Sequence, residues 1–325
     1  VISAELFGQA GPMLAELRRS RRLPVVSVGA SRPGTLEFEA AVAENSADPV
    51  VATTHADETA FWLYTSGSTG IPKAARHLHG SPAHTAQHYG HGVVGIEPDD
   101  VIFSAAKLFF AYGLGNGMSF PFSVGATAIY LPDRPTPDAV LALMAHHRPS
   151  IFCGVPTLYA SLLAHPSLSR GAGSSRLRRC LSAGEALPEE IGRKWQDIVG
   201  IEILDGIGST ELLHIFISNR PGQVRYGTSG KPVDGYQARV VDEQGRDVAT
   251  EEIGELLVSG PTAADGYWNQ RERSRKTFVG TWTATGDKYR LDQDGYYHYC
   301  GRADDLFKVS GIWVSPFEVE SALLG

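Results

Sequence analysis

Residues 64–73 carry the sequence Tyr64-Thr65-Ser66-Gly67-Ser68-Thr69-Gly70-Ile71-Pro72-Lys73. The apolar run at residues 61–63 precedes this stretch and predicts a strand that leads into a loop. Glycines let the backbone approach an anion closely, and successive amide groups can surround phosphate oxygens. The hydroxyl groups and the lysine add donors and a positive charge. The stretch therefore predicts a polyphosphate-binding loop, with a solvated Gly/Ser turn as the alternative.

This loop differs from the Walker loop in a physical way. The Walker motif runs through Gly-Lys-Ser/Thr directly into a helix. Here Pro72 precedes the lysine, and a proline disfavours helical geometry in the residue before it. Lys73 is followed by Ala74, so no hydroxyl follows the lysine to bind magnesium.

Length, charge and cysteine content limit the class of protein. A chain of 325 residues predicts two or more domains. The net charge of −7 argues against nucleic acid or an anionic membrane as the main partner. No run of 18 apolar residues is present, so we expect no membrane span. Cys153, Cys180 and Cys300 are far apart and odd in number, which indicates a reducing, cytoplasmic compartment without a disulfide framework.

Apolar runs and helical patterns alternate along most of the chain. Near the start we expect a helix at residues 11–22, a strand at 23–28 and a polar connection at 34–58. Further strands are expected at residues 101–105, 127–131, 150–155, 179–182 and 202–204, and helices at 81–89, 137–147, 156–164 and 188–199. Near-continuous apolar strands alternating with helices predict an α/β fold, with sheets covered by helices.

The texture changes after about residue 225. Glycine-marked turns separate short strands expected at residues 237–242, 254–259, 282–285 and 296–299, with a hairpin turn at 243–246. We therefore expect α/β subdomains over residues 1–225, a β-rich subdomain over 226–303, and a hinge with the start of a small domain over 304–325. Because the chain begins without Met and ends in an apparent helix, we also expect it to be a fragment.

Three further motifs offer groups that suit a nucleotide. Residues 205–211, Asp-Gly-Ile-Gly-Ser-Thr-Glu, follow an apolar strand and place a hydroxyl and a carboxylate among glycines, as a nucleotide and its Mg²⁺ require. Thr285-Gly286-Asp287 places a carboxylate where we expect a strand to end, suited to a ribose diol. Residues 301–311 bring an arginine, two aspartates and a lysine together among glycines.

In this order the four motifs resemble those of the adenylate-forming superfamily, which contains acyl-CoA synthetases, luciferases and peptide-synthetase adenylation domains. The segments at residues 182–185 and 254–260 fit the same pattern. Within the superfamily the chain is most similar to the benzoate-CoA ligase family, through residues 107–116, 208–216 and 308–318. The resemblance covers nearly the whole chain.

The resemblance implies a two-step reaction. A small aromatic carboxylate attacks the α-phosphate of ATP to give acyl-AMP and pyrophosphate, and the thiol of coenzyme A then displaces AMP. It implies roles for residues of each motif: Thr65, Ser66, Gly67, Ser68, Thr69, Gly70 and Lys73 at the outer phosphates; Thr210 at the α-phosphate; Glu211 at Mg²⁺; Asp287 and Arg302 at the ribose; Gly184, Glu185, Asp205, Gly206 and Ile207 beside the adenine; Ala111, Tyr112, Gly113, Gly208 and His214 at the acyl group; and Asp304 as the hinge.

The chain departs from the superfamily pattern in two places. Many members have an aromatic residue at the position of Ile207, although isoleucine still offers an apolar face to adenine. The family's catalytic lysine belongs to the C-terminal domain, beyond the end of this chain, and the first part of the large domain also lacks a counterpart. For this chain the resemblance therefore implies ATP and acid binding with slow acyl-AMP formation.

Alternatives stay open for several of these residues. Residues 111–113 suit a helix start packed in the core as well as a pocket wall, His214 suits a core histidine, and Asp304 suits a polar turn. His84 and His88 are one helical turn apart, but neither cysteine nor carboxylate joins them, which argues against zinc. The alternative functions are activation of an aliphatic acid, transfer to a carrier protein, or nucleotide binding with little turnover. We expect a monomer or homodimer.

Overall fold

The computed structural model describes residues 1–20, 24–45, 47–48, 50–65, 72–303, 307–309 and 312–314. The predicted phosphate-loop residues 66–70 and the predicted hinge Asp304 lie outside this part of the chain. Contacts divide the chain into two compact units, Val1–Thr53 and Thr54–Gly325. The predicted boundaries at residues 225 and 303 fall inside the second unit and stay predictions. None of the helices in the described ranges is long and apolar enough to cross a membrane.

The first unit is a small parallel sheet with two helices. Its elements are β1 (Ile2–Ser3), α1 (Phe7–Ser20), β2 (Val26–Val28), β3 (Leu36–Glu37) and α2 (Phe38–Ala43), with strand order β1-β2-β3. The expected helix begins four residues earlier than predicted, at Phe7. The predicted polar connection at residues 34–58 contains β3 and α2, because Phe38 and Val42 recur at helical spacing within a mostly polar stretch.

A seven-stranded sheet forms the centre of the second unit. Its strands are β6 (Val101–Ser104), β7 (Thr127–Ile129), β8 (Ile151–Gly154), β9 (Arg179–Ser182), β10 (Ile203–Gly208), β11 (Ile215–Ser218) and β12 (Lys231–Pro232), in the order β12-β11-β10-β9-β8-β6-β7. The five strands β6 to β10 run parallel, and β11 pairs antiparallel with both of its neighbours, β10 and β12. The expected α/β fold with helix-covered strands is confirmed.

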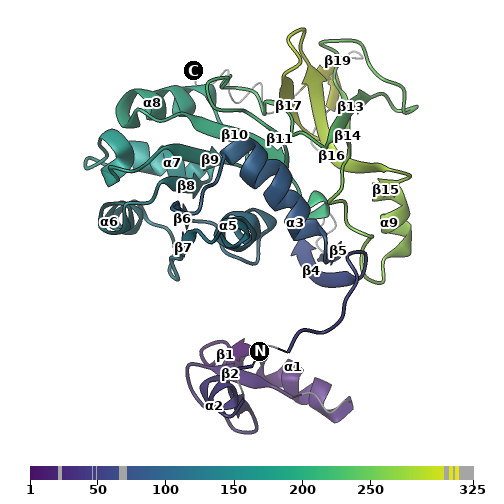
Figure 1. Cartoon of the computed structure of the whole chain (residues 1–325). Helices are drawn as coiled ribbons and strands as arrows, with labels where there is room; N and C mark the ends of the chain where they lie inside the picture. Colours follow the sequence, from purple (N-terminus) through teal and green to yellow (C-terminus); the bar gives the residue numbers. More distant parts are fainter. Residues whose placement is uncertain are drawn as a thin grey trace. The chain divides into compact units, whose positions relative to one another are not determined.

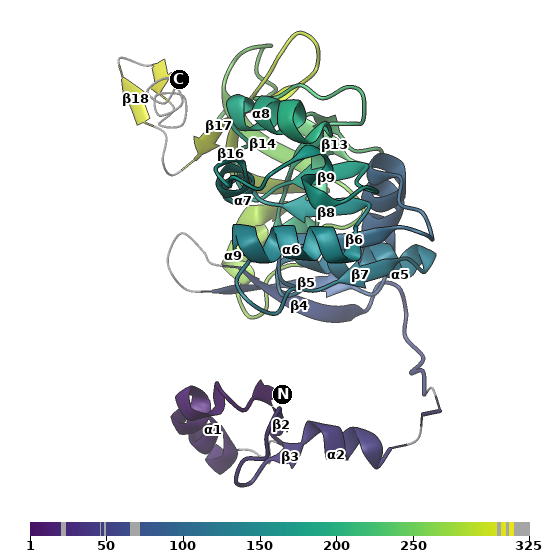
Figure 2. The same ribbon diagram turned by 90° about the vertical axis from the view of Figure 1, so that its left-hand side faces the viewer.

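Successive residues of these strands enter two different cores. On β8, Phe152 packs with α6 (Pro137–His147), α7 (Pro156–Leu163) and α8 (Glu189–Val199), whereas Ile151 and Cys153 pack on the opposite face. Figures 1 and 2 show these three helices together on one face, and α3 (Ser81–Thr85) and α5 (Phe120–Val124) on the other. Both faces are buried, which explains why the strands read as continuous apolar runs.

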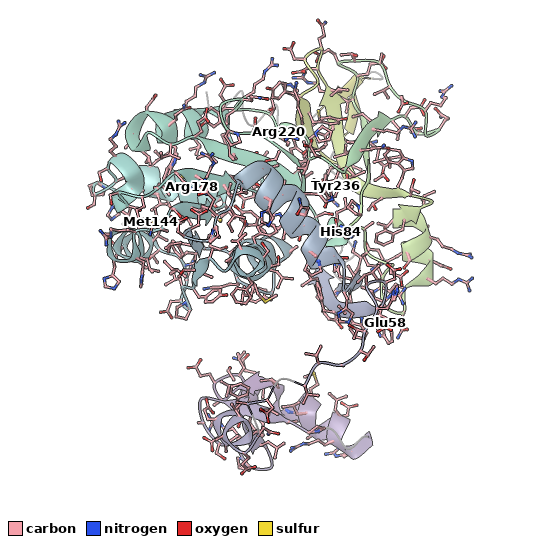
Figure 3. All side chains as sticks on the ribbon, in the orientation of Figure 1. Glu58, His84, Met144, Arg178, Arg220 and Tyr236 are labelled. Atoms are coloured by element: carbon pink, nitrogen blue, oxygen red, sulfur yellow. The ribbon has the colours of Figure 1, made fainter. Side chains whose placement is uncertain are left out.

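The helix expected at residues 81–89 changes its winding. It begins as α3 (Ser81–Thr85), which carries His84, labelled in Figure 3, and continues as the π-helix η1 (Ala86–Val94). Gly90 in η1 lies against Phe120, because a Cβ there would stand 3.2 Å from the ring. A second π-helix, η2 (Gly115–Ser119), follows α4 (Ala111–Leu114). Wide turns of this kind concentrate at functional sites.

The β-rich part is an antiparallel sheet. Strands β13 (Gln237–Val241), β14 (Gly254–Ser259), β16 (Trp282–Leu291) and β15 (Phe278–Val279) follow one another, with α9 (Arg271–Thr277) before β15, and β17 (Tyr297–Arg302) pairs with β16. β16 is longer than the strand predicted at residues 282–285. Asp287 therefore lies within a strand and not at its end, because β17 extends the pairing past Gly286. Two hairpins, β4 (Thr59–Thr65) with β5 (Lys73–Leu78) and β18 (Phe307–Val309) with β19 (Ile312–Val314), stand apart from this sheet.

Candidate active site

The candidate site begins where β10 leaves the central sheet. Its last residues are Ile207 and Gly208, and the single turn η4 (Thr210–Leu212) follows directly. Ser209 caps this turn, since its hydroxyl accepts a hydrogen bond from the Leu212 amide at 3.3 Å. The predicted residues Thr210 and Glu211 thus stand on a short, capped turn at the carboxyl end of a parallel strand, where α/β sheets commonly place their ligands.

Strand β5 lies between two partners. On one side β4 pairs with it, and Thr65 stands opposite Lys73. On its other side, residues 265–268 run along β5: the Arg76 amide donates to the Gly266 carbonyl and the Trp268 amide to the Ala74 carbonyl, both at 2.9 Å. The hairpin that carries the predicted phosphate loop is therefore fixed on both edges.

Lys73 and Glu211 meet at a shared tyrosine. The Lys73 Nζ lies 3.3 Å from the Glu211 Oε1 and 3.0 Å from the Tyr267 hydroxyl. The Tyr267 hydroxyl donates to the same Glu211 oxygen at 2.6 Å. The side chains of Lys73 and Glu211 are 21% and 15% exposed, so this ion pair is partly shielded from water. Two residues predicted from separate motifs are thus in direct contact.

Asp287 and Arg302 form a second pair beside the first. They face each other across β16 and β17, and the Arg302 Nη1 donates to the Asp287 Oδ1 at 2.8 Å. The pKa of Asp287 is raised, because burial outweighs the lowering effect of Arg302. The turn η4, which carries Glu211, contacts β16, which carries Asp287. We call Lys73, Glu211, Tyr267, Asp287 and Arg302 the charged cluster.

His77 lies beneath the same turn. It is fully buried on β5 and stacks on Phe61 with ring centroids 5.4 Å apart. Burial lowers its pKa to about 4, against smaller raising effects of the Thr210 backbone and of the Glu211 charge. A neutral imidazole therefore supports the turn that presents Glu211.

Rings surround His214 on several sides. Its ring lies 4.6 Å from that of Phe120, 5.0 Å from Tyr89 and 5.7 Å from Tyr112, measured between centroids. Burial lowers the pKa of His214 to about 3, with the Tyr112 backbone opposing the shift. We call Tyr89, Tyr112, Phe120 and His214 the aromatic cluster. The structure therefore brings together two predicted acyl-pocket residues, Tyr112 and His214.

The predicted pocket glycines have no free space at their Cα atoms. A Cβ on Gly113 would stand 2.0 Å from the Lys107 carbonyl oxygen, and one on Gly208 would stand 2.6 Å from that of His214. A larger residue at Gly113 would therefore disturb the backbone before it could fill a pocket. The neighbouring Gly115 has the same property toward a side chain, because its Cβ would stand 2.3 Å from the His214 ring.

The residues predicted beside adenine lie at the ends of β9 and β10. Gly184 has a φ of +95°, a conformation that favours glycine, and Glu185 is exposed. Asp205 is only 4% exposed, and burial raises the pKa of its carboxyl to about 8. Gly206 and Ile207 follow it on β10. The five residues share one edge of the sheet.

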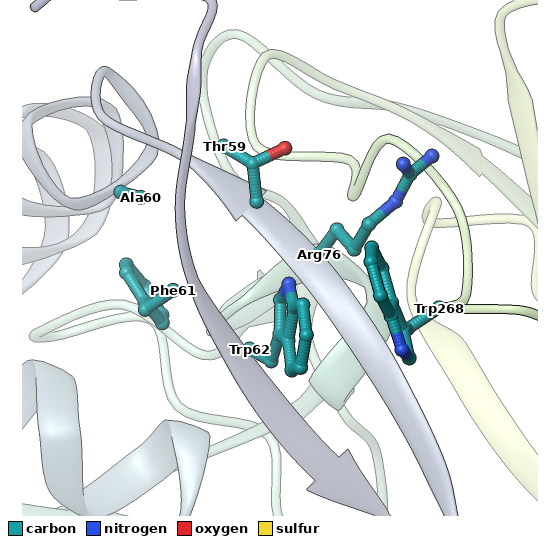
Figure 4. Close-up of a pocket in the computed structure, with 6 residues that line it drawn as sticks. All are labelled: Thr59, Ala60, Phe61, Trp62, Arg76 and Trp268. Atoms are coloured by element: carbon teal, nitrogen blue, oxygen red, sulfur yellow. The ribbon is translucent and has the colours of Figure 1, made fainter. Parts of the chain in front are cut away.

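A surface cavity of about 400 Å³ lies on the outer side of β4. Figure 4 shows its lining, in which Trp62 and Trp268 stack with ring centroids 4.4 Å apart beside Arg76. None of its lining residues belongs to the charged or the aromatic cluster. In the part of the chain that the structure describes, no three His, Cys, Asp or Glu side chains gather to hold a metal ion.

Sequence reasoning missed Tyr267. The residue stands in the segment Gly266-Tyr267-Trp268, which contains no local pattern of hydroxyls, glycines and charges. Its hydroxyl meets Lys73 across 194 residues of sequence and Glu211 across 56. No signal within that segment predicts these contacts.

The chain is similar in sequence to known enzymes. The family model described as AMP-binding enzyme matches residues 8–268. A benzoate–CoA ligase of Thauera aromatica is 54% identical over the whole chain, which spans 61% of that relative. A 4-hydroxybenzoate–CoA/benzoate–CoA ligase of Rhodopseudomonas palustris is 52% identical over 92% of the chain and 56% of the relative. The chain thus spans less than two thirds of the length of these relatives.

The chain is also similar to solved structures of aryl-CoA ligases. A benzoate CoA ligase from Burkholderia xenovorans matches with a TM-score of 0.90 and 48% identity, over 100% of this chain and 63% of that one. An anthranilate CoA ligase in complex with anthranoyl-AMP matches with a TM-score of 0.93 and 42% identity, over 99% of this chain and 62% of that one.

Proposed function

The chain belongs to the AMP-binding enzyme family, and on that premise we propose that it serves an ATP-dependent aryl-acid ligase. The substrate is benzoate or a substituted benzoate, and the final acceptor is coenzyme A. The similar ligases of Thauera aromatica and Rhodopseudomonas palustris, which act on benzoates, support the substrate class. The observation that carries the proposal is the charged cluster, in which residues from separate motifs gather near the turn η4 that follows β10.

In the first step a carboxylate oxygen of the acid bonds to the α-phosphorus of ATP. The bond from that phosphorus to the bridging oxygen breaks, and pyrophosphate leaves. In the second step the thiol sulfur of coenzyme A attacks the acyl carbon, its proton is lost, and AMP leaves. Both steps require positioned charges at phosphorus and exclusion of water more than covalent chemistry by the protein.

Each charged group has a role in this scheme. Lys73, with the loop before it, binds the outer phosphates, Thr210 binds the α-phosphate, and the Asp287–Arg302 pair binds the ribose. Glu211 is the carboxylate that fits Mg²⁺, because in nucleotide sites this ion takes one or two carboxylates together with phosphate oxygens. An ion held there would supply positive charge against the phosphate oxygens. Gly184, Glu185, Asp205, Gly206 and Ile207 border the adenine.

The aromatic cluster belongs to the acyl side of the site. Tyr112 and His214 present ring surfaces, and Ala111 and Gly113 stand beside Tyr112 on α4. A benzoate ring packs favourably against such faces and edges. The neutral His214 adds no charge to this environment.

Benzoate-dependent exchange of labelled pyrophosphate into ATP tests the proposal. Exchange with benzoates, and not with fatty or amino acids, is the expected result. Exchange only with aliphatic acids would instead favour another acid-activating enzyme. ATP binding without exchange would favour a nucleotide-binding role with little turnover. The monomeric or dimeric state and the cytoplasmic location stay predictions.

A further inference from the structure

One side chain at the centre of the charged cluster still has no role. We propose that Tyr267 is a positioning residue that holds the Glu211 carboxylate by one oxygen, leaves the other oxygen for Mg²⁺, and remains its partner when Lys73 turns to the phosphates of ATP. This inference rests on the function proposed above and extends it to a residue that neither the motifs nor the comparisons single out.

The backbone around Tyr267 is fixed by β5. Hydrogen bonds join β5 to residues 265–268 on both sides of the tyrosine, and Tyr267 forms an isolated bridge with Ala75. The same stretch reaches the Glu211 backbone, since the Ala264 amide donates to the Glu211 carbonyl at 2.8 Å. The segment at residues 264–268 therefore fixes the β4–β5 hairpin relative to the turn that carries Glu211.

The side chain of Tyr267 has little freedom. It is 4% exposed, and its ring lies 5.5 Å from that of Phe278. Its own amide donates to the Ser274 hydroxyl at 2.9 Å. A side chain held in this way is suited to orienting a neighbour, because its hydroxyl position is set by packing.

The contacts of the hydroxyl define its chemistry. A phenol hydroxyl can donate one hydrogen bond and accept another. It therefore donates to Glu211 at 2.6 Å, a length typical of a charge-assisted O–H···O⁻ bond, and accepts from Lys73 at 3.0 Å. Lys73 and Glu211 thus both contact the phenol oxygen. Either of these side chains can move away while the other keeps its contact with Tyr267.

The exchange of partners has an electrostatic reason. In the structure, Lys73 lies 3.3 Å from Glu211 and 4.6 Å from the centre of the Tyr267 ring. When Lys73 binds phosphate, the partly buried carboxylate loses its cation. A retained hydrogen bond from Tyr267 keeps the carboxylate oriented until Mg²⁺ restores a positive partner.

The test compares ATP binding to the wild-type chain and to Tyr267→Phe. Calorimetry gives the ATP dissociation constant in saturating Mg²⁺ and again in EDTA, and the ratio of the two measures the benefit from the metal. Removing a residue that orients a metal ligand typically weakens metal binding by about 10- to 100-fold. We expect the ratio to fall by about that factor, with ATP binding in EDTA nearly unchanged.

Two controls separate orientation from general damage. Tyr297→Phe removes a comparable hydroxyl, which donates to the Ala238 carbonyl at 3.1 Å, and should leave the ratio unchanged. Glu211→Gln removes the group through which Tyr267 acts. In that background Tyr267→Phe should have no further effect on the ratio, because effects that pass through one group are not additive.

An unchanged ratio, equal weakening in Mg²⁺ and EDTA, or an effect that persists in the Glu211→Gln background would overturn the role of Tyr267. Unfolding of Tyr267→Phe in a thermal melt without ATP would also overturn it, by showing that the hydroxyl serves stability. Failure of the wild-type chain to bind Mg·ATP would instead count against the proposed function.

Discussion

The charged cluster and the aromatic cluster lie in the same unit but differ in whether their polar atoms have hydrogen-bond partners. In the charged cluster, Lys73, Tyr267 and Glu211 share contacts of 2.6–3.3 Å. In the aromatic cluster the buried Tyr112 hydroxyl has no hydrogen-bond partner among the described residues. The first arrangement can exchange partners with a charged ligand. The second excludes charge and presents ring surfaces.

The largest effect is expected from Glu211→Gln, which keeps the shape of the side chain and removes its charge. Loss of one positioned electrostatic group typically slows a reaction by about 10²–10³, equivalent to about 2.7–4 kcal/mol. Single-turnover formation of benzoyl-AMP measures it. Glu255→Gln on β14 is the matched control. A rate within threefold of wild type would show that the charge of Glu211 does not contribute to formation of benzoyl-AMP.

Asp287→Ala should weaken ATP binding next most strongly. A hydrogen bond to a charged group contributes about 1.5–3 kcal/mol, so affinity should fall by roughly 10- to 150-fold. Calorimetry with ATP measures the loss. Asp294→Ala removes an exposed carboxylate paired with Arg225 and should change affinity little. Unchanged ATP affinity in Asp287→Ala would show that Asp287 does not bind the ribose of ATP.

The aromatic cluster should lower the stability of the folded chain in acid. The folded pKa of His214, about 3, lies below the unfolded value, so between pH 6.5 and 3 only the unfolded chain binds this proton. Stability is therefore full above about pH 6.5 and falls as the pH decreases. His214→Phe should remove this loss, retaining about 2 kcal/mol relative to wild type at pH 5.

Urea unfolding at pH 7 and pH 5 measures this difference between wild type and His214→Phe. His84→Phe, at an exposed position on α3, is the control and should follow the wild-type pH profile. If His214→Phe loses as much stability in acid as wild type does, then burial of a neutral His214 is not the source of the acid sensitivity.

The smallest effect is expected from Tyr112→Phe. Removing a buried hydroxyl that has no partner removes its desolvation penalty, so the free energy of unfolding should stay within about 1 kcal/mol of wild type or rise slightly. Urea unfolding checks this value. A loss of several kcal/mol would show that the Tyr112 hydroxyl is bonded, and the contrast with the Tyr267 hydroxyl would disappear.

The sequence predicted best what depends on neighbours along the chain. α6 at residues 137–147 and β14 at residues 254–259 have the predicted bounds. α6 begins with Pro137, and β14 begins with Gly254 after a turn, so each carries its boundary signal locally. The sequence predicts an ordinary helix where the π-helix η1 lies, because π-helices are rare and apolar spacing alone indicates an α-helix.

The site was predictable where a motif carries its own chemistry. Asp287 and Arg302 were both predicted and are paired, but their pairing across β16 and β17 follows from strand register and not from either motif. Tyr267 was not predicted as a site residue, because its contacts form only when its segment joins β5. The crowding at Gly113 escaped for a similar reason, since the Lys107 carbonyl that fills the space is set by the loop before α4.

The spacing of these contacts along the chain bears on synthesis by the ribosome. Lys73 must meet Glu211 across 138 residues and Tyr267 across 194. Contacts so distant form late in folding, because the intervening chain must first be ordered. A nascent chain that ends before Tyr267 carries the phosphate hairpin without one of its edges. On the proposed function, we therefore expect ATP to bind only after residues 265–268 have joined β5.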